Sequence, residues 1–363
     1  MKKITVFLMA GLLMGTNVQA ATFCVSNSTM LETVLDITES NGQSDVIKIQ
    51  SGNYIPLNSY GFRFYLGENH GLDISGSWSS GCAEQSMNPL DTILDGDNSN
   101  RVISFYTDQN SPEITASISL SVMSVNNGLH HEQSTVGYNT SGLGFRLSFA
   151  HEGSITVDRL FFMNNRSNRA SAIRGDGAKL TIKNSVFFNN ESDSGTVSTV
   201  AKKFYFINNT MVNNTYYDQF NGGTSNAGLF ISSFTEQAFV ANNIIWDNYG
   251  PDVLALSTPE VYLYNNDYQS VSGTFDYMSG NISEDPQLEF FAPPITSPVV
   301  DKGKSKPSGI IPFPPPFYLN WNYGDYDFLN LDRVVNNRVD IGAIEALPEE
   351  PIFKNGFEQT RGG

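Results

Sequence analysis

A short pattern that ends in paired asparagines recurs through the middle of the chain and limits the folds that it can adopt. It is written four times, as ITVDRLFFMNN (155–165), LTIKNSVFFNN (180–190), FYFINNTMVNN (204–214) and AFVANNIIWDN (238–248). The final asparagines are 25, 24 and 34 residues apart, and weaker copies stand at 118–127 and 261–268. A period in the twenties is typical of a solenoid, in which each repeat forms one coil.

The residue types within each repeat indicate strands. Apolar residues alternate with other residues in runs rich in Val, Ile, Phe and Thr, which is the pattern of β-strands. The Leu-x-x-Leu-x-Leu pattern of leucine-rich repeats is absent, and 155–270 has no long stretch with helical spacing. Strands that occupy the same place in successive coils stack in parallel, about 4.8 Å apart. The sequence therefore predicts an all-β chain folded as a parallel β-helix.

The repeated asparagines have a structural interpretation. Asn tolerates left-handed backbone geometry at corners between strands, and its amide can bond to the Asn of the next coil and form a ladder. A ladder requires repetition, whereas a catalytic or glycan-acceptor site does not, so we favour the ladder. Its predicted members are the last asparagine of each copy and an upstream partner, which Arg159 replaces in the first copy: Asn165, Asn190, Asn214, Asn248, Asn184, Asn208, Asn242 and Asn265. We expect the longest interval to hold a loop around 217–226.

The first 20 residues have the pattern of a secretory signal peptide. MKKITVFLMAGLLMGTNVQA combines two lysines, a short apolar run and a small-residue cleavage site,. The run is too short to span a bilayer, and no other stretch is apolar enough to do so,. We therefore expect export to the cell surface, the medium or the periplasm.

The charge of the chain narrows the choice of partners. The formal net charge is −16, and removal of the two lysines in the signal peptide makes it more negative. Such a surface repels nucleic acid and anionic membranes. Neutral glycans, cationic groups or calcium can approach such a surface without this repulsion. We predict no bound cofactor, although calcium is compatible with this charge, and we expect a monomer.

The two cysteines indicate one disulfide in an exported chain. A bond between Cys24 and Cys82 would tie the N-terminal end to the early coils. Two unpaired thiols are the alternative, which an oxidising compartment disfavours.

The ends of a solenoid expose unpaired strand groups and need covers. At the N-terminal end, Thr29 and Glu32 fit a capping box that begins a helix, and Asn41 with Gly42 ends it,. From about residue 286 the repeat fades into a Pro-rich stretch that we expect to wrap the last coils,. The predicted organisation is a signal peptide (1–20), a β-helix with an N-terminal capping helix (21–285), a loop-rich C-terminal cap (286–347) and a tail (348–363).

Longer stretches resemble a known group of proteins. FCVSNSTMLETVLDITESNGQSDVIKIQSGNY, LDISGSW, TILDGDNSNRVISF and SLSVMSVNNG are similar to exported bacterial right-handed β-helix proteins of the pectin-lyase-like type. ANNIIWDN, ISEDPQL, SPVVDKG and DRVVNNRVDIGAIE resemble the choice-of-anchor Q domain, although the residues before Arg333 depart from its usual pattern. The resemblance implies a right-handed β-helix and export. It implies no particular activity, because this fold hosts many functions.

Motifs of enzymes with this fold are missing. The Asp-Asp and Gly-His-Gly stretches of β-helical polygalacturonases are absent, as is the Arg-x-Pro-x-x-Arg of pectate lyases. A hydrolase needs two carboxylates that face one groove, and a lyase needs a base with a neutraliser of charge. We therefore assign no catalytic residue from the sequence.

Four groups of residues are candidates for other chemistry, each with a simpler interpretation. Asp91, Asp95 and Asp97 could hold a cation, but a polar turn is favoured because the calcium-loop spacing is incomplete. His130, His131, Glu132 and His151 could suggest a metal site. We disfavour it, because neighbouring residues on a strand point to opposite faces. We expect Arg174-Gly175-Asp176, an integrin-type tripeptide, to form a turn. The last group is Asp327, Arg333, Asp340 and Glu345. We expect these residues to form ion pairs that hold the C-terminal cap in place, in preference to a catalytic Asp–Arg pair.

Aromatic residues make up 12% of the chain, with clusters at Tyr216-Tyr217, Phe290-Phe291 and 317–321. Exposed rings stack on the apolar faces of sugars, although many rings must pack in the core. Three functions stay open: a non-catalytic protein that binds polysaccharide or a cell-surface glycan, a polysaccharide lyase or glycoside hydrolase, and a structural or adhesive surface protein.

Overall fold

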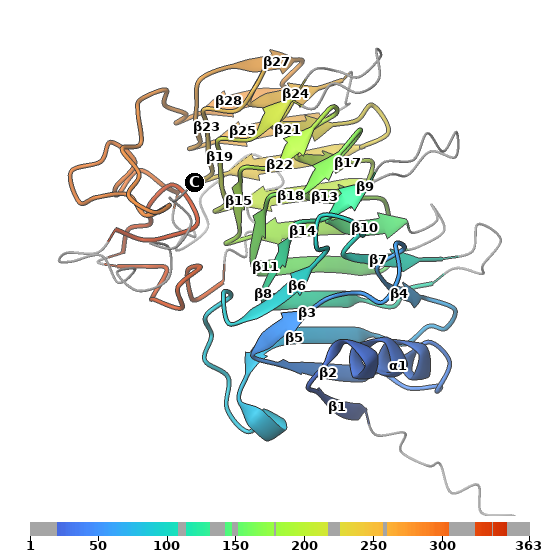
Figure 1. The fold of residues 1–363 in the computed structure, drawn as a ribbon. Helices are drawn as coiled ribbons and strands as arrows, with labels where there is room; N and C mark the ends of the chain where they lie inside the picture. The colour runs from blue at the N-terminus through green and yellow to red at the C-terminus, as the bar shows by residue number, and fades with distance from the viewer. Residues whose placement is uncertain are drawn as a thin grey trace, which may run out of the picture.

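The computed structural model describes residues 20–107, 114–130, 142–146, 152–177, 179–216, 226–256, 260–304, 324–335 and 337–346. The chain forms a right-handed parallel β-helix, with the first coils at the bottom of Figure 1 and the last at the top. The strand pairs along the main path of the largest sheet are all parallel. The fold predicted from the repeats is therefore confirmed.

Three sheets form the coils in the described part of the chain. The largest, sheet A, has as its main path β1 (Ala21–Val25), β2 (Asp45–Gln50), β5 (Leu72–Trp78), β8 (Ile118–Asn126), β11 (Ser154–Met163), β14 (Lys179–Lys183), β18 (Lys203–Ile207), β22 (Gln237–Ala241), β25 (Glu260–Tyr264) and β28 (Tyr277–Ser279). Off this path lie β3 (Gly52–Tyr54), β6 (Thr92–Asp95), β15 (Val186–Phe188), β19 (Thr210–Val212), β23 (Ile244–Trp246) and β26 (Asp267–Tyr268).

The other two sheets complete each coil. Sheet B contains β4 (Phe62–Tyr65), β7 (Ile103–Tyr106), β10 (Leu143–Arg146), β13 (Ile173–Gly175), β17 (Val197–Thr199), β21 (Leu229–Ile231), β24 (Val253–Ala255) and β27 (Val271–Gly273). Sheet D is short and contains β9 (Leu129–His130), β12 (Arg166–Ser167), β16 (Glu191–Ser192) and β20 (Thr215–Tyr216).

The core consists of rows of side chains that run along the axis of the solenoid. One row joins Leu180, Phe204 and Ala238, which are register partners in neighbouring coils and are fully buried. In another row the rings of Phe162 and Phe187 stack with centroids 4.8 Å apart. Aromatic pairs of this kind contribute about 0.5–1.5 kcal/mol beyond their burial, so the repeated Phe residues stabilise the stack of coils.

The N-terminal end is closed by α1 (Ser28–Thr38), whose Leu31, Val34 and Leu35 are buried in the core. The capping box predicted at Thr29 is wrong. Asn27 is the N-cap and its side chain accepts a hydrogen bond from Met30 N at 2.9 Å. Glu32 is not available for a capping box, because its carboxylate accepts from the backbone N–H of a neighbouring loop. A single turn of 3₁₀-helix, η1 (Ser80–Cys82), follows β5.

The predicted disulfide between Cys24 and Cys82 is confirmed, with the Cα atoms 5.8 Å apart. It links β1 to η1 and so fixes the first strand to the segment after β5, two strands along sheet A. In the described residues, no helix has both the length and the apolar character needed to cross a membrane.

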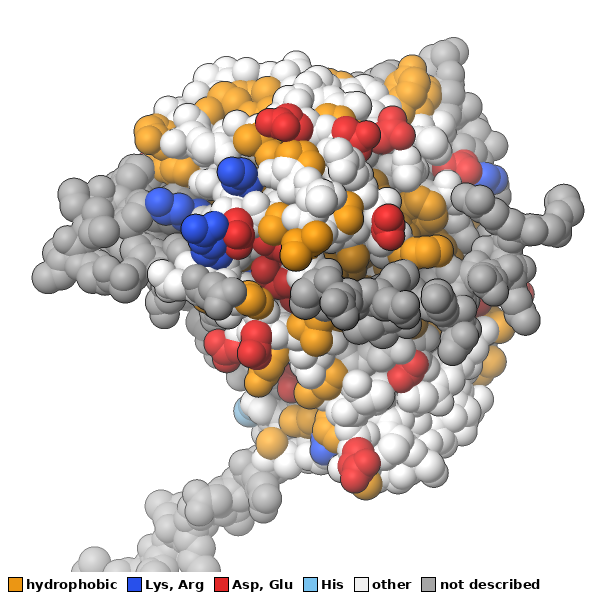
Figure 2. Space-filling view, turned by 90° about the vertical axis from the view of Figure 1, so that its left-hand side faces the viewer, with side chains coloured by type: hydrophobic (Ala, Val, Ile, Leu, Met, Phe, Trp, Pro, Cys, Tyr) orange, Lys and Arg blue, Asp and Glu red, His pale blue; other side chains and the backbone are white. Residues whose placement is uncertain are grey.

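The loop-rich C-terminal part lies along the flank of the solenoid (Figure 1). Phe291 packs against Phe161 and Phe188, and Val299 and Ile341 pack against β19 and β23. On this face of the molecule acidic side chains are scattered among apolar ones, and several of the basic side chains gather toward one edge (Figure 2). The C-terminal part therefore covers one side of several coils.

Candidate functional site

The two members of each asparagine pair have different tasks. The first member turns the chain, with positive φ at Asn164 (57°), Asn189 (52°) and Asn213 (56°). The second points inward: Asn190 Nδ2 donates to Asn214 Oδ1 at 2.9 Å, and Asn214 Nδ2 donates to Asn248 Oδ1 at 2.8 Å. Asn165 Nδ2 donates to Asn190 Oδ1 at 3.0 Å. The structure thus brings the four last asparagines of the copies into one buried row.

The four upstream asparagines occupy the other corner of the coil. Each has a left-handed backbone, with φ between 48° and 56°, at Asn184, Asn208, Asn242 and Asn265. Arg159 and Val122 hold the same conformation in earlier coils. The residues that follow Asn208, Asn242 and Asn265 are Asn209, Asn243 and Asn266, which point inward and form a second row with Asn281. The prediction selected the turn residue at this corner instead of its inward neighbour.

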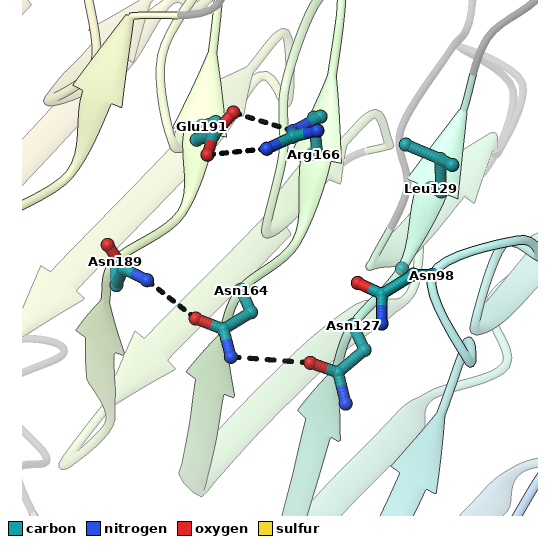
Figure 3. A pocket seen from close by; sticks show the side chains of 8 residues that line it. Asn98, Asn127, Leu129, Asn164, Arg166, Asn189 and Glu191 are labelled. Carbon is teal, nitrogen blue, oxygen red and sulfur yellow. Dashed lines mark hydrogen bonds and ion pairs between the residues drawn. The ribbon is translucent and has the colours of Figure 1, made fainter. Parts of the chain in front are cut away.

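Beside the first buried row, an open hollow of about 310 Å³ lies on the outside of the solenoid. Figure 3 shows two parallel rows of side chains in it. In the first row Asn189 Nδ2 donates to Asn164 Oδ1 at 2.6 Å, and Asn164 Nδ2 donates to Asn127 Oδ1 at 3.3 Å. Asn98 lies beside Asn127 at one end. The hollow therefore presents a line of amide groups along the axis.

The second row is formed by the strands of sheet D. Leu129, Arg166 and Glu191 are register partners in three successive coils. Arg166 binds the Glu191 carboxylate with two bonds, from Nε at 2.6 Å and from Nη2 at 2.8 Å (Figure 3). Both side chains are partly exposed. This two-bonded arrangement holds the planar guanidinium and the carboxylate in fixed positions.

A pair of tyrosines extends this row. Thr215 N donates to Asn190 O and Tyr249 N donates to Asn214 O, so Tyr249 lies two coils beyond Glu191, about 10 Å along the axis,. Its ring stacks on Tyr216 with centroids 5.1 Å apart, and 52% of Tyr249 is exposed. The predicted neighbour Tyr217 lies outside the described residues. The pair therefore continues the row of sheet D beyond the hollow, with Tyr249 half exposed.

The side chains that line the hollow favour binding over catalysis. Glu191 is the single carboxylate among them, and Arg166 already occupies its oxygens. A glycoside hydrolase needs two carboxylates about 5–10 Å apart across the bond that is cut. Amides, by contrast, offer both donors and acceptors for sugar hydroxyls. The arrangement can bind a polar, uncharged chain through hydrogen bonds and ring stacking.

A second cluster of charged residues joins the C-terminal part to the solenoid. Arg333 is fully buried, and its Nη1 lies 2.9 Å from Glu345 Oε1. Its Nη2 donates to Asn184 Oδ1 at 2.9 Å, while Glu345 N donates to Asp327 Oδ2 at 3.0 Å. Asp340 accepts from Asp301 N and Ala346 N. The four residues predicted to pin this part of the chain therefore lie in one network.

Burial controls the ionisation of this cluster. It raises the pKa of Asp327, Asp340 and Glu345 above their usual values, and the nearby Arg333 guanidinium opposes that rise. Because Arg333 is fully buried and bonded on both terminal nitrogens, no substrate can reach it without displacement of the chain. This network is suited to a structural task.

A third group lies on the outer face of sheet A. Asp158 lies 3.8 Å from Arg159 Nε and 3.8 Å from Lys183 Nζ. Asn184 Nδ2 donates to Asp158 Oδ1 at 3.0 Å. The side chains of the charged residues are 12–20% exposed. These residues place a carboxylate beside two cations, one of which, Arg159, also donates to Asn330 Oδ1 of the C-terminal part at 2.9 Å.

The remaining candidates behave as local structure. Asp91 accepts from Ser86 and Asn88, and Asp95 accepts from Asn127 and from Asp97 N, as in a polar turn. No group of three or more metal-binding side chains occurs among the residues that the structure describes.

The integrin-type tripeptide is not a turn, because Arg174 and Gly175 end strand β13. The Arg174 and Asp176 side chains are mostly buried, so the tripeptide is not displayed. Of the predicted aromatic cluster, Phe290 is half exposed and Phe291 is packed. His131, Glu132, His151 and 317–321 lie outside the described residues, as does the side chain of His130.

The outward amides Asn127, Asn164 and Asn189 were missed in the sequence although a signal was present. Each of them is one member of an Asn-Asn pair in the sequence. Because the member with positive φ turns the chain, only the other member can face the core. The contact between Tyr216 and Tyr249 carried no such signal, because it depends on which coils are adjacent.

No family model and no curated protein matches the sequence. Two solved structures of the pectin methylesterase from Aspergillus niger are similar, one deglycosylated and one that keeps an N-acetylglucosamine stub. They share 11% and 12% identity with the chain, over 74% of it and 88% of the solved chains, with a TM-score of 0.33 in both cases. The assignment of the fold therefore rests on the strand pairing of this chain.

Proposed function

We propose that this is an exported, non-catalytic β-helix protein whose outer hollow binds a neutral polysaccharide or cell-surface glycan. The observation that carries the proposal is the alignment of one row of amides, one Arg–Glu pair and one exposed tyrosine pair along the same side of the solenoid. Successive coils repeat about every 4.8 Å, which is close to the length of one hexose unit. A linear glycan can therefore meet equivalent groups on successive coils.

The net charge of the chain favours neutral glycans over acidic ones as ligands. With a net charge of −16, the protein repels polyanions at low salt,. The hollow itself holds one cation and one anion, and these neutralise each other. We therefore assign neutral glycans as the ligand class, in preference to acidic glycans bridged by calcium.

Export and surface location belong to the same proposal. A disulfide such as Cys24–Cys82 is stable in an oxidising compartment,, and the first 20 residues have the pattern of a signal peptide. We assign residues 286–347 as a choice-of-anchor Q-type end, on the resemblance of its sequence to that domain.

The test is a binding screen with the mature protein. Neutral linear oligosaccharides such as cellohexaose, xylohexaose and mannohexaose would be compared with oligogalacturonate, with and without a calcium chelator. We expect binding to a neutral chain that the chelator does not change. Binding to oligogalacturonate alone, lost with chelator, would contradict the proposal.

A polysaccharide lyase is the second candidate, favoured by the Asp158, Arg159 and Lys183 group on sheet A. A lyase releases unsaturated uronates, which absorb in the ultraviolet. If such products form from an acidic polysaccharide, Lys183→Ala should abolish them while Asn164→Gly leaves them unchanged. If neither binding nor product is found, a structural or adhesive role remains.

A further inference from the structure

Among the residues that the structure describes, no strand covers the last coil of the solenoid. Strand β28 ends sheet A and, among the described strands, pairs with β25 alone. All three of its residues are exposed, and most of β27 beside it is exposed as well. Both strands stand at the top of the solenoid in Figure 1. The outer backbone groups of β28 are therefore open to another strand.

A core row ends in solvent at this coil. Phe206, Val240 and Leu263 are register partners in successive coils and are fully buried. Met278 is the next member of the row, opposite Leu263, yet 45% of it is exposed. Tyr277 beside it is 42% exposed. An interior position that is half open indicates that one more layer belongs above it.

The two ends of the solenoid differ. At the N-terminal end, α1 buries Leu31 and Leu35 in the core and closes it. The described residues of the C-terminal part lie along the flank, and β28 stays exposed. Each chain thus has one closed end and one open end, so pairing of open ends yields a closed dimer and no filament.

We propose that the open end binds the same end of a second copy, in place of the monomer expected from the sequence. A two-fold axis normal to sheet A at Met278 sets β28 antiparallel to its copy, so that the sheet continues from one chain into the other. Met278 then lies opposite Met278 of the partner subunit, and the two core rows meet. This inference is independent of the glycan proposal.

The charge at this end permits such contact. The stretch VSGTFDYMSG (271–280) contains a single charged residue in a chain of net charge −16. That residue, Asp276, accepts a hydrogen bond from Val261 N at 2.7 Å. Two copies can therefore approach here without the repulsion that the rest of the surface generates.

Sedimentation velocity of the mature protein tests the proposal. We expect twice the mass of one chain for the wild type, one chain for Met278→Lys, and again twice the mass for the control Leu57→Lys, an exposed apolar site near the N-terminal end. Circular dichroism would show that each variant is folded. A wild type at the mass of one chain, or a mass that grows without limit with concentration, would overturn it.

A cross-link gives the geometry independently. Both native cysteines are bridged, so Met278→Cys adds one free thiol. Oxidation should join two chains through residue 278, because the two-fold axis sets these residues opposite each other. Oxidised protein that remains a single chain on a non-reducing gel would contradict the pairing of the two open ends.

Discussion

Arg333 Nη2 donates a hydrogen bond at 2.9 Å to Asn184 Oδ1, which is 149 residues earlier in the chain. Asn184 is a corner residue of the solenoid, and Arg333 belongs to the C-terminal part. The same guanidinium binds Glu345 and two backbone carbonyls. One buried cation thus joins the last described segment of the chain to a coil in its middle.

Substitution of this arginine tests that connection. Arg333→Met leaves the Glu345 carboxylate and the Asn184 amide buried without their partner, and we expect a loss of about 3–5 kcal/mol in the free energy of unfolding. Arg338→Met is the matched control, because it breaks the exposed ion pair with Asp301 and should cost at most about 1 kcal/mol,. Urea unfolding of both variants gives the comparison. Equal losses would show that Arg333 does not anchor the C-terminal part.

The two asparagines of a pair should contribute differently to the stability of the folded protein. Asn190→Ala removes the bonds to Phe162 O and Asn214 Oδ1 in the buried row, and each unsatisfied group costs about 1–3 kcal/mol. Asn189→Gly keeps the left-handed turn at φ 52° and removes an exposed amide with its solvent-exposed hydrogen bond to Asn164 Oδ1. We expect a large fall in the urea midpoint for Asn190→Ala and a small one for Asn189→Gly. Similar midpoints would mean that the inward row does not stabilise the stack.

A buried carboxyl predicts a pH dependence of stability. Asp267 is fully buried, and its burial raises the pKa from 3.8 to about 7. Because the folded state holds this proton more tightly than the unfolded state, stability is greatest below pH 4 for this group and falls as pH rises to about 7. The slope in that window is at most about 1.4 kcal/mol per pH unit.

Asp267→Asn should make the profile less steep in that window, although the buried carboxyls of the C-terminal part still contribute to it. Asp247→Asn, a change of an exposed carboxylate at a left-handed turn, is the matched control and should keep the profile of the wild type. Urea midpoints measured between pH 4 and 8 give the result. A wild type and an Asp267→Asn variant with parallel profiles would show that this carboxyl does not titrate as described.

The sequence predicted the fold because repetition reveals which residues are equivalent in successive coils. Phe162 and Phe187 stand three residues before Asn165 and Asn190, so stacked coils must stack the rings. The disulfide was predictable because only two cysteines exist. The start of α1 was misplaced because Asn27 and Thr29 are both good caps, and the choice depends on packing,.

The candidate site was less predictable, for reasons of geometry. Alignment identified repeated asparagines but not which member of each pair faces outward, since this depends on where the left-handed residue falls. The tyrosine pair joins Tyr216 to a residue in the following, longer repeat, so its contact appears only when the coils are placed. The contact of Arg333 with Asn184 lies outside any repeat.

The affinity of the mature protein for a neutral linear hexasaccharide, measured by titration calorimetry, tests the central claim most directly. Wild type would be compared with Asn164→Gly, which removes one amide from the hollow and keeps its turn at φ 57°. Asn213→Gly is the control, because it makes the same change at an exposed corner outside the lining of the hollow. Loss of one or two hydrogen bonds predicts about tenfold weaker binding for Asn164→Gly, with the control unchanged. Equal affinities for all three proteins would contradict the assignment of this hollow as the glycan site.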